Sequence, residues 1–309
     1  MTNEEYDLII IGAGPAGLTA GLYAGRYKLN TLVLGSLPGG MITESYKMCN
    51  FPTYKEISGA EFTQKMMSQV SDLGVKISPE NVNNIEKIQN NAKTEFKVET
   101  GSKVYSGKEI IIATGSDKNK LNIPGEKEFL GRGVSYCATC DAGFYKDKIV
   151  GVIGGGDAAL SSALLIAEYA KKVYIIYRRE EFRKANASWI EQVEKNDKID
   201  FIFNAVPEEI YGTKDEGVKG IKLEDGRNIE LDGVFAEIGS TPEKKISRML
   251  GVETNDKGYI KTNKNQKTSV EGVYAAGDIT DNPLKQVITA AGQGAVAAHV
   301  AYEEITKNN

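Results

Sequence analysis

The chain has 309 residues, enough for about two domains, and its 41% apolar and 26% charged content is that of an ordinary globular protein. The net charge of −4 argues against a nucleic-acid-binding protein, because phosphate binding needs a basic surface. No apolar run approaches the ~18 residues of a membrane helix, so we expect neither a nucleic-acid nor a membrane partner.

The segment 6–35 predicts a strand, a glycine turn, a helix and a second strand. The apolar run before Gly12 is short, bounded and rich in isoleucine, which is typical of a buried parallel strand. No basic stretch precedes this run, so we interpret it as a strand and not as a signal peptide. The second strand ends in "VLGS", which holds neither an acid nor an arginine and does not separate FAD from NAD.

Gly12, Gly14 and Gly17 supply the spacing G-x-G-x-x-G at this turn. The first glycine allows the tight turn, the second lets the backbone approach a pyrophosphate, and the third permits close packing of the helix on the strand. The start of the helix then faces the anion. A turn that packs without a ligand shows the same spacing, but the strand and helix around it favour dinucleotide binding.

A further strand is predicted at 109–116, and it ends in Ala113, Thr114 and Gly115. This stretch resembles chain that passes beneath a flavin. We expect the first domain to be interrupted here, because a crossing near 115 leads into a second domain.

Cys137 and Cys140 are separated by two residues, and Asp141 follows them directly. A closed zinc site needs four Cys or His ligands, whereas the chain holds three cysteines and one histidine without a second clustered pair. A passive structural disulfide is unusual in a chain without an export signal. We therefore expect a redox couple and no metal, and we expect Cys49 to be a small buried residue.

A second strand–turn–helix unit begins at 148 and repeats the glycine spacing with Gly154, Gly156 and Ala159. Two such units make a chance match of the spacing much less probable than one. The strand that follows ends in Arg178 and Arg179, with Arg183 four positions further on.

These arginines distinguish the second unit from the first. Guanidinium groups stay charged and match phosphate geometry with two parallel hydrogen bonds, so they suit the 2′-phosphate of NADPH. A solvated basic face at a strand end is the alternative interpretation.

Short strands and turns between about 200 and 235 predict an antiparallel sheet that covers the second unit. We place the domain crossings near 115 and 243. The predicted fold is α/β, with two Rossmann-like, three-layer dinucleotide-binding domains, the second inserted into the first. The first dinucleotide-binding domain is expected at 1–114 plus 243–309, and the NADPH-binding domain at 115–242; the resemblance described below implies that the first of them is the FAD-binding domain.

A last strand, at 272–280, also resembles chain under a flavin and ends at Gly277 and Asp278. The stretch after it predicts a helix rich in alanine and glycine that runs almost to the end. Such a helix start can approach a ligand closely and carries a partial positive charge, although close helix packing alone explains the composition too.

Several motifs occur together in one order and spacing: "GAGPAG", "ATGS", "GVSYCATCD", "GGGDAA", "RREEFR", "YAAGD" and "KQVITAAGQGAVAA". In these motifs the chain resembles the bacterial-type, low-molecular-weight thioredoxin reductases over residues 5–305. The resemblance implies a cytoplasmic, homodimeric flavoenzyme that passes electrons from NADPH through FAD to the Cys137–Cys140 disulfide, and then to the disulfide of thioredoxin or a thioredoxin-like protein.

The resemblance also implies roles for individual residues. Cys140 faces the flavin, Cys137 attacks the protein substrate, and Asp141 is the acid–base group for the thiolate. A carboxylate that only favours the helix dipole is the alternative for Asp141. Because one flavin must react with both NADPH and the cysteine pair, a swivel of the inserted domain about Gly115 and Gly239 is implied.

The residues expected to bind FAD occupy the family's motif positions: Gly12, Gly14, Pro15, Ala16, Gly17, Gly39, Gly40, Met41, Asn50, Ala113, Thr114, Gly115, Gly277, Asp278, Lys285, Gln286 and Val287. The residues expected to bind NADPH are Gly154, Gly156, Asp157, Ala158, Ala159, Arg178, Arg179 and Arg183.

Some positions depart from the family's pattern. Met41 replaces a polar residue, Ser161 and Ser162 replace an acidic pair, and Tyr177 replaces a histidine. These departures leave three alternatives open. The same disulfide chemistry could use ferredoxin or a deazaflavin as donor, the chain could be a flavin-dependent dithiol oxidase, or it could be a flavin-binding regulatory protein with an inert disulfide.

Overall fold

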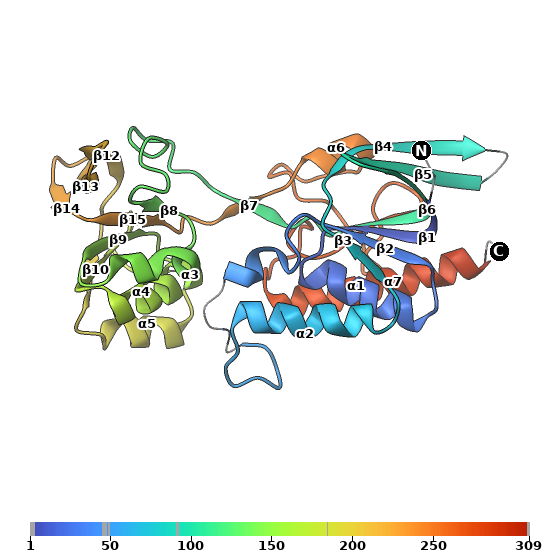
Figure 1. The fold of residues 1–309 in the computed structure, drawn as a ribbon, viewed down its shortest axis with the longest axis horizontal. Coiled ribbons are helices and arrows are strands. Elements are labelled where there is room, and N and C mark those ends of the chain that lie inside the picture. The colour runs from blue at the N-terminus through green and yellow to red at the C-terminus, as the bar shows by residue number, and fades with distance from the viewer. Residues whose placement is uncertain (1–3, 45–47, 49, 91–92, 184, 308–309) are drawn as a thin grey trace. The chain divides into compact units, whose positions relative to one another are not determined.

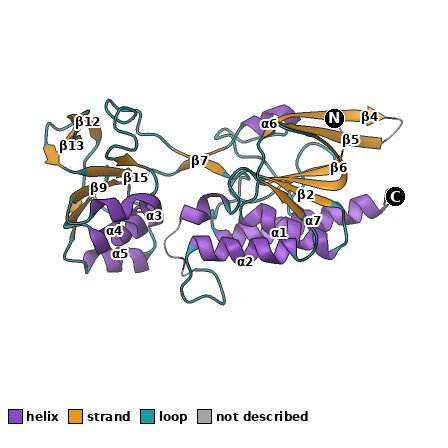
Figure 2. Ribbon diagram, in the orientation of Figure 1, coloured by secondary structure: helices purple, strands orange, loops and turns teal. Residues whose placement is uncertain are grey.

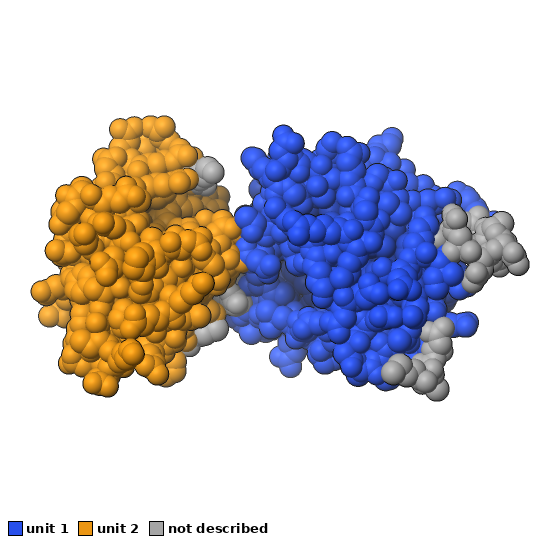
Figure 3. Space-filling view, turned by 90° about the horizontal axis from the view of Figure 1, so that it is seen from above, with its two compact units in different colours: residues 1–117, 241–309 blue, residues 118–240 orange. Residues whose placement is uncertain are grey.

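The computed structural model describes residues 4–44, 48, 50–90, 93–183 and 185–307. The chain divides into two compact units, coloured separately in Figure 3: unit 1 is Met1–Asp117 with Thr241–Asn309, and unit 2 is Lys118–Ser240. Unit 2 is therefore inserted into unit 1.

Unit 1 contains a sheet in which the strands follow the order β3-β2-β1-β6-β5-β4 (Figure 1). The strands β3, β2, β1 and β6 are parallel, and β17 adds a parallel pairing to the carboxyl half of β6 at Ile110–Ile112. The strands β5 and β4 continue antiparallel from the amino half of β6. The ends of β1, β6 and β17 therefore meet at one edge of the sheet.

The elements of unit 1, with the crossing strands, have these bounds: β1 (Glu4–Ile11), α1 (Pro15–Arg26), β2 (Thr31–Leu34), the short 3-10 helix η1 (Gly40–Glu44), α2 (Gly59–Ser71), β3 (Lys76–Ser78), β4 (Val82–Asn90), β5 (Lys93–Thr100), β6 (Val104–Ile112), β7 (Ser116–Lys118), β16 (Ser240–Pro242), α6 (Lys245–Leu250), β17 (Val273–Ala275) and α7 (Val287–Lys307).

Alternation along β1 explains the layers of unit 1. Leu8 and Ile10 pack in a core with apolar residues of α1, α2 and α7. Ile9 and Ile11 point to the other face, where they pack with residues of β4, β5 and α6. The strand is thus apolar throughout because it is buried on both faces.

Unit 2 repeats this plan around a parallel sheet of order β11-β10-β9-β15-β8. Figure 2 shows α4 and α5 on one side of this sheet and β12 and β13 on the other. Val150 and Val152 of β9 pack in one core with α4 and α5. Ile176 and Val234 lie in a second core with Ile221 of the antiparallel sheet β12-β13-β14. Helices therefore cover one face of the parallel sheet, and a small sheet covers the other.

The elements of unit 2 have these bounds: β8 (Val134–Ser135), α3 (Ala138–Asp141), the 3-10 helix η2 (Ala142–Tyr145), β9 (Ile149–Ile153), α4 (Asp157–Tyr169), β10 (Lys172–Ile176), α5 (Ala187–Glu194), β11 (Ile199–Ile202), β12 (Pro207–Thr213), β13 (Gly217–Leu223), β14 (Asn228–Glu230) and β15 (Gly233–Ala236).

The two chain crossings pair with each other, since β7 and β16 form a two-stranded sheet. The amide of Asn119 donates to the carbonyl of Gly239 at 2.9 Å, and the amide of Glu243 donates to Gly115 at 3.3 Å. Gly115 and Gly239 both have positive φ, at 71° and 88°.

The predicted fold class is confirmed, because both units are α/β with a parallel sheet between two covering layers. In the part of the chain that the structure describes, no helix is both long and apolar enough to cross a membrane.

A buried polar cluster lies in unit 1, where β6 and β17 meet α7. Glu109 of β6 is 6% exposed, and its Oε2 has no hydrogen-bond partner. Tyr274 of β17 donates to Glu304 of α7 at 2.5 Å, and Lys267 pairs with the same carboxylate. Burial raises the pKa of Glu109 to about 8, and the charge of Glu304 adds to this effect.

This pKa predicts that Glu109 destabilises the protein at alkaline pH. Its folded pKa of about 8 exceeds the ordinary 4.5, so the fold loses stability as pH rises from about 4.5 to about 8. We expect E109Q to remove this loss and to raise Tm at pH 9, relative to wild type, by about 3–8 °C more than at pH 5. Thermal unfolding at both pH values measures the difference.

The control is E303Q, because Glu303 lies on the exposed side of α7 with half of its side chain accessible. It should leave the pH dependence of Tm unchanged. An equal shift by E109Q at both pH values would contradict the prediction.

Candidate functional site

The first glycine turn closes against the neighbouring strand. Gly12 has φ of 116°, and a Cβ there would lie 2.1 Å from the carbonyl oxygen of Ala113. A Cβ on Gly17 would lie 1.8 Å from the carbonyl oxygen of Gly12. At Gly14, by contrast, a Cβ would lie 3.9 Å from its nearest neighbour, the carbonyl oxygen of Gly39. The turn is therefore tightly packed at Gly12 and Gly17, whereas space remains beside Gly14 at the start of α1.

This open helix start suits an anion. Pro15 occupies the first turn, which holds no acidic residue, and the backbone N–H groups there point along the helix axis. Gly39 and Gly40 follow β2 with φ of 89° and 58°, and the amide of Gly39 donates to Ala13 at 2.6 Å. The two glycine segments thus form one backbone cradle that fits a pyrophosphate.

Two polar groups of this cradle suit a hydroxyl-rich ligand such as FAD. Thr114 Oγ1 is buried without a hydrogen-bond partner. Among the described residues, Asp278 makes no side-chain hydrogen bond. Burial raises the pKa of Asp278, and the nearby Lys285 opposes that rise. A ligand that donates a hydrogen bond to a buried, unpartnered acceptor is bound more tightly, because the bond removes the cost of leaving that acceptor unsatisfied.

Residues expected to bind FAD also meet between the N-terminal and C-terminal parts of unit 1. Asn50 donates its side-chain amide to Gln286 at 2.8 Å, just before Val287 opens α7. Lys285 donates to the carbonyl of Thr280, and burial lowers the pKa of its ammonium. The structure thus brings together segments more than two hundred positions apart.

Two contributors to this cradle are absent from the sequence-based set. Gln293 of α7 accepts from the amide of Gly277 at 2.8 Å. Thr63 of α2 lies where a Cβ on Gly39 would come within 2.4 Å. Neither residue belongs to a recognisable motif, so only the packing of distant elements reveals them.

Met41 differs from these residues because it is 42% exposed, with Ser116 Oγ 4.0 Å from its sulfur. A thioether is a weak acceptor, so Met41 adds an apolar contact where the family pattern has a polar one.

The cysteine segment lies in unit 2, and Cys137 is disulfide-bonded. The amide of Cys137 donates to Ser135 Oγ at 3.0 Å, and its carbonyl accepts from the amide of Asp141 at 3.1 Å. The backbone of Cys140 lies in α3, but its side chain and all of Cys49 fall outside the described residues. The structure therefore shows an oxidised Cys137 at the entrance of a short helix.

Asp141 ends that helix, and its charge acts on a neighbour. The pKa of Tyr145 rises to about 12, first because the ring is buried and then because Asp141 lies close. The structure thus places the carboxylate of Asp141 in the cysteine helix itself, and its acid–base role stays a prediction.

The residue before the disulfide is held firmly. Tyr136 donates its hydroxyl to the buried Glu126, and the ammonium of Lys120 lies 3.6 Å from its ring centroid. Glu126 also accepts from the amides of Leu121 and Asn122 at 2.6 and 2.7 Å. These contacts hold Tyr136, the residue next to Cys137, in one position.

The second glycine turn has the same construction as the first. A Cβ on Gly154 would lie 2.2 Å from the carbonyl oxygen of Glu237, while one on Gly156 would meet nothing within 4 Å. A Cβ on Gly155 would lie 2.5 Å from the ring of Tyr177. This turn is thus tightly packed at Gly154 and Gly155 and open at Gly156. The carboxylate of Asp157 is engaged with the amide of Asn186 at 2.6 Å.

Two of the three predicted arginines border a hollow of about 290 Å³, which is lined by Arg179, Glu180, Arg183 and Asn204. Arg183 pairs with Glu180 and Glu181 at 2.5 and 3.2 Å. Within the described part of the chain, the guanidinium groups of Arg178 and Arg179 make no hydrogen bond or ion pair. Arg179, an unpaired cation that lines the hollow, and Arg178, which precedes it at the strand end, fit a phosphate.

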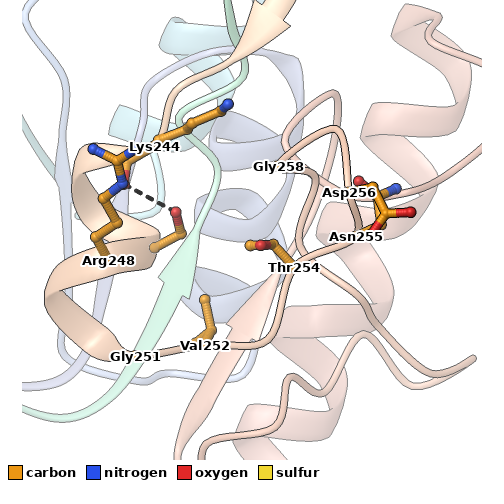
Figure 4. A pocket seen from close by; sticks show the side chains of 9 residues that line it. Lys244, Arg248, Gly251, Val252, Thr254, Asn255, Asp256 and Gly258 are labelled. Atoms are coloured by element: carbon orange, nitrogen blue, oxygen red, sulfur yellow. Dashed lines mark hydrogen bonds between the residues drawn. The ribbon is translucent and has the colours of Figure 1, made fainter.

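A larger hollow of about 370 Å³ lies in unit 1 along α6 and the loop after it (Figure 4). Lys244 and Arg248 border it on one side and Asp256 on another. No residue expected to bind FAD or NADPH lines it.

Two open glycine turns at the ends of parallel strands, with an oxidised cysteine ahead of the second, define a dinucleotide-dependent disulfide oxidoreductase. A model of the pyridine nucleotide-disulphide oxidoreductase family matches residues 6–294, and the chain belongs to this family.

Similar proteins narrow this further. A thioredoxin reductase of Listeria monocytogenes is 40% identical over 313 residues, which cover 99% of this chain and 96% of the relative. The structure of Lactococcus lactis thioredoxin reductase in the FR conformation is 35% identical, with a TM-score of 0.92 over 98% of this chain and 99% of that one. A ferredoxin-flavin thioredoxin reductase from Clostridium acetobutylicum is 34% identical, with a TM-score of 0.54 over 99% of this chain and 100% of that one. The resemblance to bacterial-type thioredoxin reductases is confirmed, while the roles of single residues stay predictions.

The geometry of the first turn predicts different effects for two glycines. G17A should destabilise the protein with or without flavin by about 1–3 kcal/mol, because its Cβ meets the backbone of Gly12. G14A should leave the flavin-free protein as stable as wild type but weaken FAD binding, because its Cβ points into the open cradle. Thermal unfolding of the apoprotein and FAD titration separate the two effects. A G14A protein that binds FAD normally would contradict the assignment of the cradle.

Proposed function

We propose that the chain is an NADPH-dependent thioredoxin reductase. The observation that carries the proposal is the disulfide at Cys137, which directly precedes a second dinucleotide turn with two unpaired arginines at the adjacent strand end. A passive staple does not need a nucleotide site beside it. A relative named thioredoxin reductase at 40% identity supports thioredoxin, or a thioredoxin-like protein, as the partner.

Unit 1 is proposed to hold FAD and unit 2 to hold NADPH. The cradle at Gly12, Gly14 and Gly39 takes the pyrophosphate, and Thr114 and Asp278 take hydroxyl groups. When bound, FAD supplies hydride acceptance from NADPH and two-electron transfer to a disulfide.

The cysteines act by thiol–disulfide exchange. Cys137 and Cys140 are proposed to form the disulfide that receives two electrons and opens to two thiols. The Cys137 thiolate then attacks one sulfur of the partner's disulfide, and Cys140 resolves the mixed disulfide, which returns the pair to its oxidised form. Asp141 is proposed to hold the proton that the thiolates exchange.

A different donor is the leading alternative. The ferredoxin-flavin enzyme of Clostridium acetobutylicum is 34% identical, and Ser161, Ser162 and Tyr177 depart from the usual nucleotide pattern. Against this, the unpaired Arg178 and Arg179, and the hollow that Arg179 lines, support a 2′-phosphate. We therefore favour NADPH over ferredoxin or a deazaflavin.

We also propose a homodimer that acts in the cytoplasm. Tyr23 of α1 and Ile288 and Val296 of α7 are 37%, 41% and 38% exposed, and the last two lie eight positions apart on one side of the helix. Exposed apolar side chains on adjoining helices suit contact with a second copy. The small number of cysteines suits a reducing compartment.

Anaerobic mixing of the flavin-loaded protein with NADPH tests the donor and the disulfide together. We expect NADPH to bleach the flavin band rapidly and NADH to do so much more slowly. C140S should keep the bleaching but lose turnover of thioredoxin to background, because the mixed disulfide cannot be resolved. C49S is the matched control and should keep both.

Other outcomes identify the alternatives. Bleaching by reduced ferredoxin and not by NADPH would establish the other donor. Rapid peroxide formation with a dithiol in air would establish an oxidase, and an unchanged C140S phenotype would establish an inert disulfide.

If Arg178 and Arg179 bind the 2′-phosphate, removing them should reduce the preference of the protein for NADP⁺ over NAD⁺. R178A/R179A should weaken NADP⁺ binding by roughly a hundredfold or more, because it removes at least two charged hydrogen bonds and each contributes about 1.5–3 kcal/mol. Binding of NAD⁺, which lacks the 2′-phosphate, should change little. Isothermal titration of both nucleotides measures this, and R227A, whose arginine pairs with Asp225 far along the chain, is the control. An equal loss of affinity for NADP⁺ and NAD⁺ would contradict the assignment of these arginines to the 2′-phosphate.

A further inference from the structure

One buried carboxylate at the second glycine turn has no role in the scheme above. Glu237 directly follows β15, and its side chain is 10% exposed. Its amide donates to the carbonyl of Ile153 at 2.8 Å, and its own carbonyl is the atom that excludes a Cβ from Gly154. The backbone of Glu237 therefore touches the loop that is expected to hold the pyrophosphate.

The side chain of Glu237 is held by two other elements. Ser162 of α4 donates to its Oε1 at 3.1 Å, and Lys118 lies 4.0 Å from the same oxygen. Lys118 also donates to the carbonyl of Tyr136, the residue before Cys137. These contacts orient the carboxylate of Glu237, a group with about four acceptor sites in all.

The hydrogen bond between Ser162 and Glu237 is informative because Ser162 stands at a position where the family pattern has an acid. In the family pattern an acidic pair follows the second glycine loop, and here Ser161 and Ser162 stand in its place. The structure shows that the hydroxyl of Ser162 meets a carboxylate from the end of β15 instead. The negative charge is thus present at the turn, but it comes from the strand and not from the helix.

The order of the sheet shows which half of a dinucleotide reaches Glu237. In an open parallel sheet, a ligand lies outside the carboxyl ends of the strands, where their order reverses. Here β10 and β15 flank β9 on opposite sides. The end of β10 carries Arg178 and Arg179, which suit the 2′-phosphate of the adenosine half. The end of β15 carries Glu237, so the nicotinamide half lies toward it.

We propose that Glu237 is a positioning residue for the nicotinamide half of NADPH. Its carboxylate accepts hydrogen bonds from the ribose hydroxyl or carboxamide N–H groups of that half, and Ser162 orients it. The inference rests on the proposed use of NADPH. It also explains how the chain keeps a nucleotide site after losing the acidic pair on α4.

The test compares two ligands that share the adenosine half. Isothermal titration with NADP⁺ and with 2′,5′-ADP, which lacks nicotinamide, is carried out on the flavin-loaded protein. We expect E237Q to weaken NADP⁺ roughly ten- to a hundredfold and to leave 2′,5′-ADP unchanged. R179A should weaken both ligands, and E209Q, on the exposed side of β12, should weaken neither.

The ratio of the two affinities decides the outcome. A changed ratio in E237Q supports the proposal, and an unchanged ratio overturns it. Should E237Q fail to fold, S162A decides in the same way, because removing the hydroxyl frees the carboxylate from its orientation. If wild-type protein binds 2′,5′-ADP but not NADP⁺, the positioning role alone fails. If it binds neither, the proposed donor fails and the positioning role fails with it.

Discussion

The candidate site depends on one constraint, the close approach of a glycine turn to the backbone of the neighbouring strand. It occurs twice, where Gly12 meets the carbonyl of Ala113 and where Gly154 meets the carbonyl of Glu237. A side chain at either glycine would separate the strand ends. Because the ends stay together, the residues that follow them, Thr114 in unit 1 and Glu237 itself in unit 2, lie beside the open glycine turns.

This repetition makes the two units comparable position by position. In unit 1 the strand beside the turn contributes small and hydroxyl groups, which suit a bound flavin. In unit 2 the same place carries a carboxylate held by Ser162 and Lys118. The aromatic rings of Tyr177 and Phe182 stack beneath the second turn with centroids 5.9 Å apart, where the family pattern has a histidine. The backbone plan is thus shared, while the side chains at the rim set each unit's chemistry.

The fold was accessible from sequence because its signals are local. The isoleucine run before Gly12, the glycine spacings and the arginines after 177 all lie within short segments. The contacts of Thr63, Gln293 and Glu237 join elements far apart along the chain, so no local pattern announces them. The burial of Glu109 was equally hidden, because a single acid inside an apolar strand resembles a surface position. The nucleotide assignments remain predictions, since they depend on ligands and not on the chain's own packing.

The paired crossings have a consequence for how this architecture can arise and be taken apart. The amide of Asn119 bonds to Gly239, so the first and last residues of unit 2 are neighbours. Glu243 bonds to Gly115 in the same way, so the cut ends of unit 1 also meet. The gene segment that encodes unit 2 can therefore be inserted or removed, and after its removal a tight turn is enough to join the two parts of unit 1. Such geometry suits an origin by duplication of one nucleotide module within another, and it makes each module a natural candidate for independent expression.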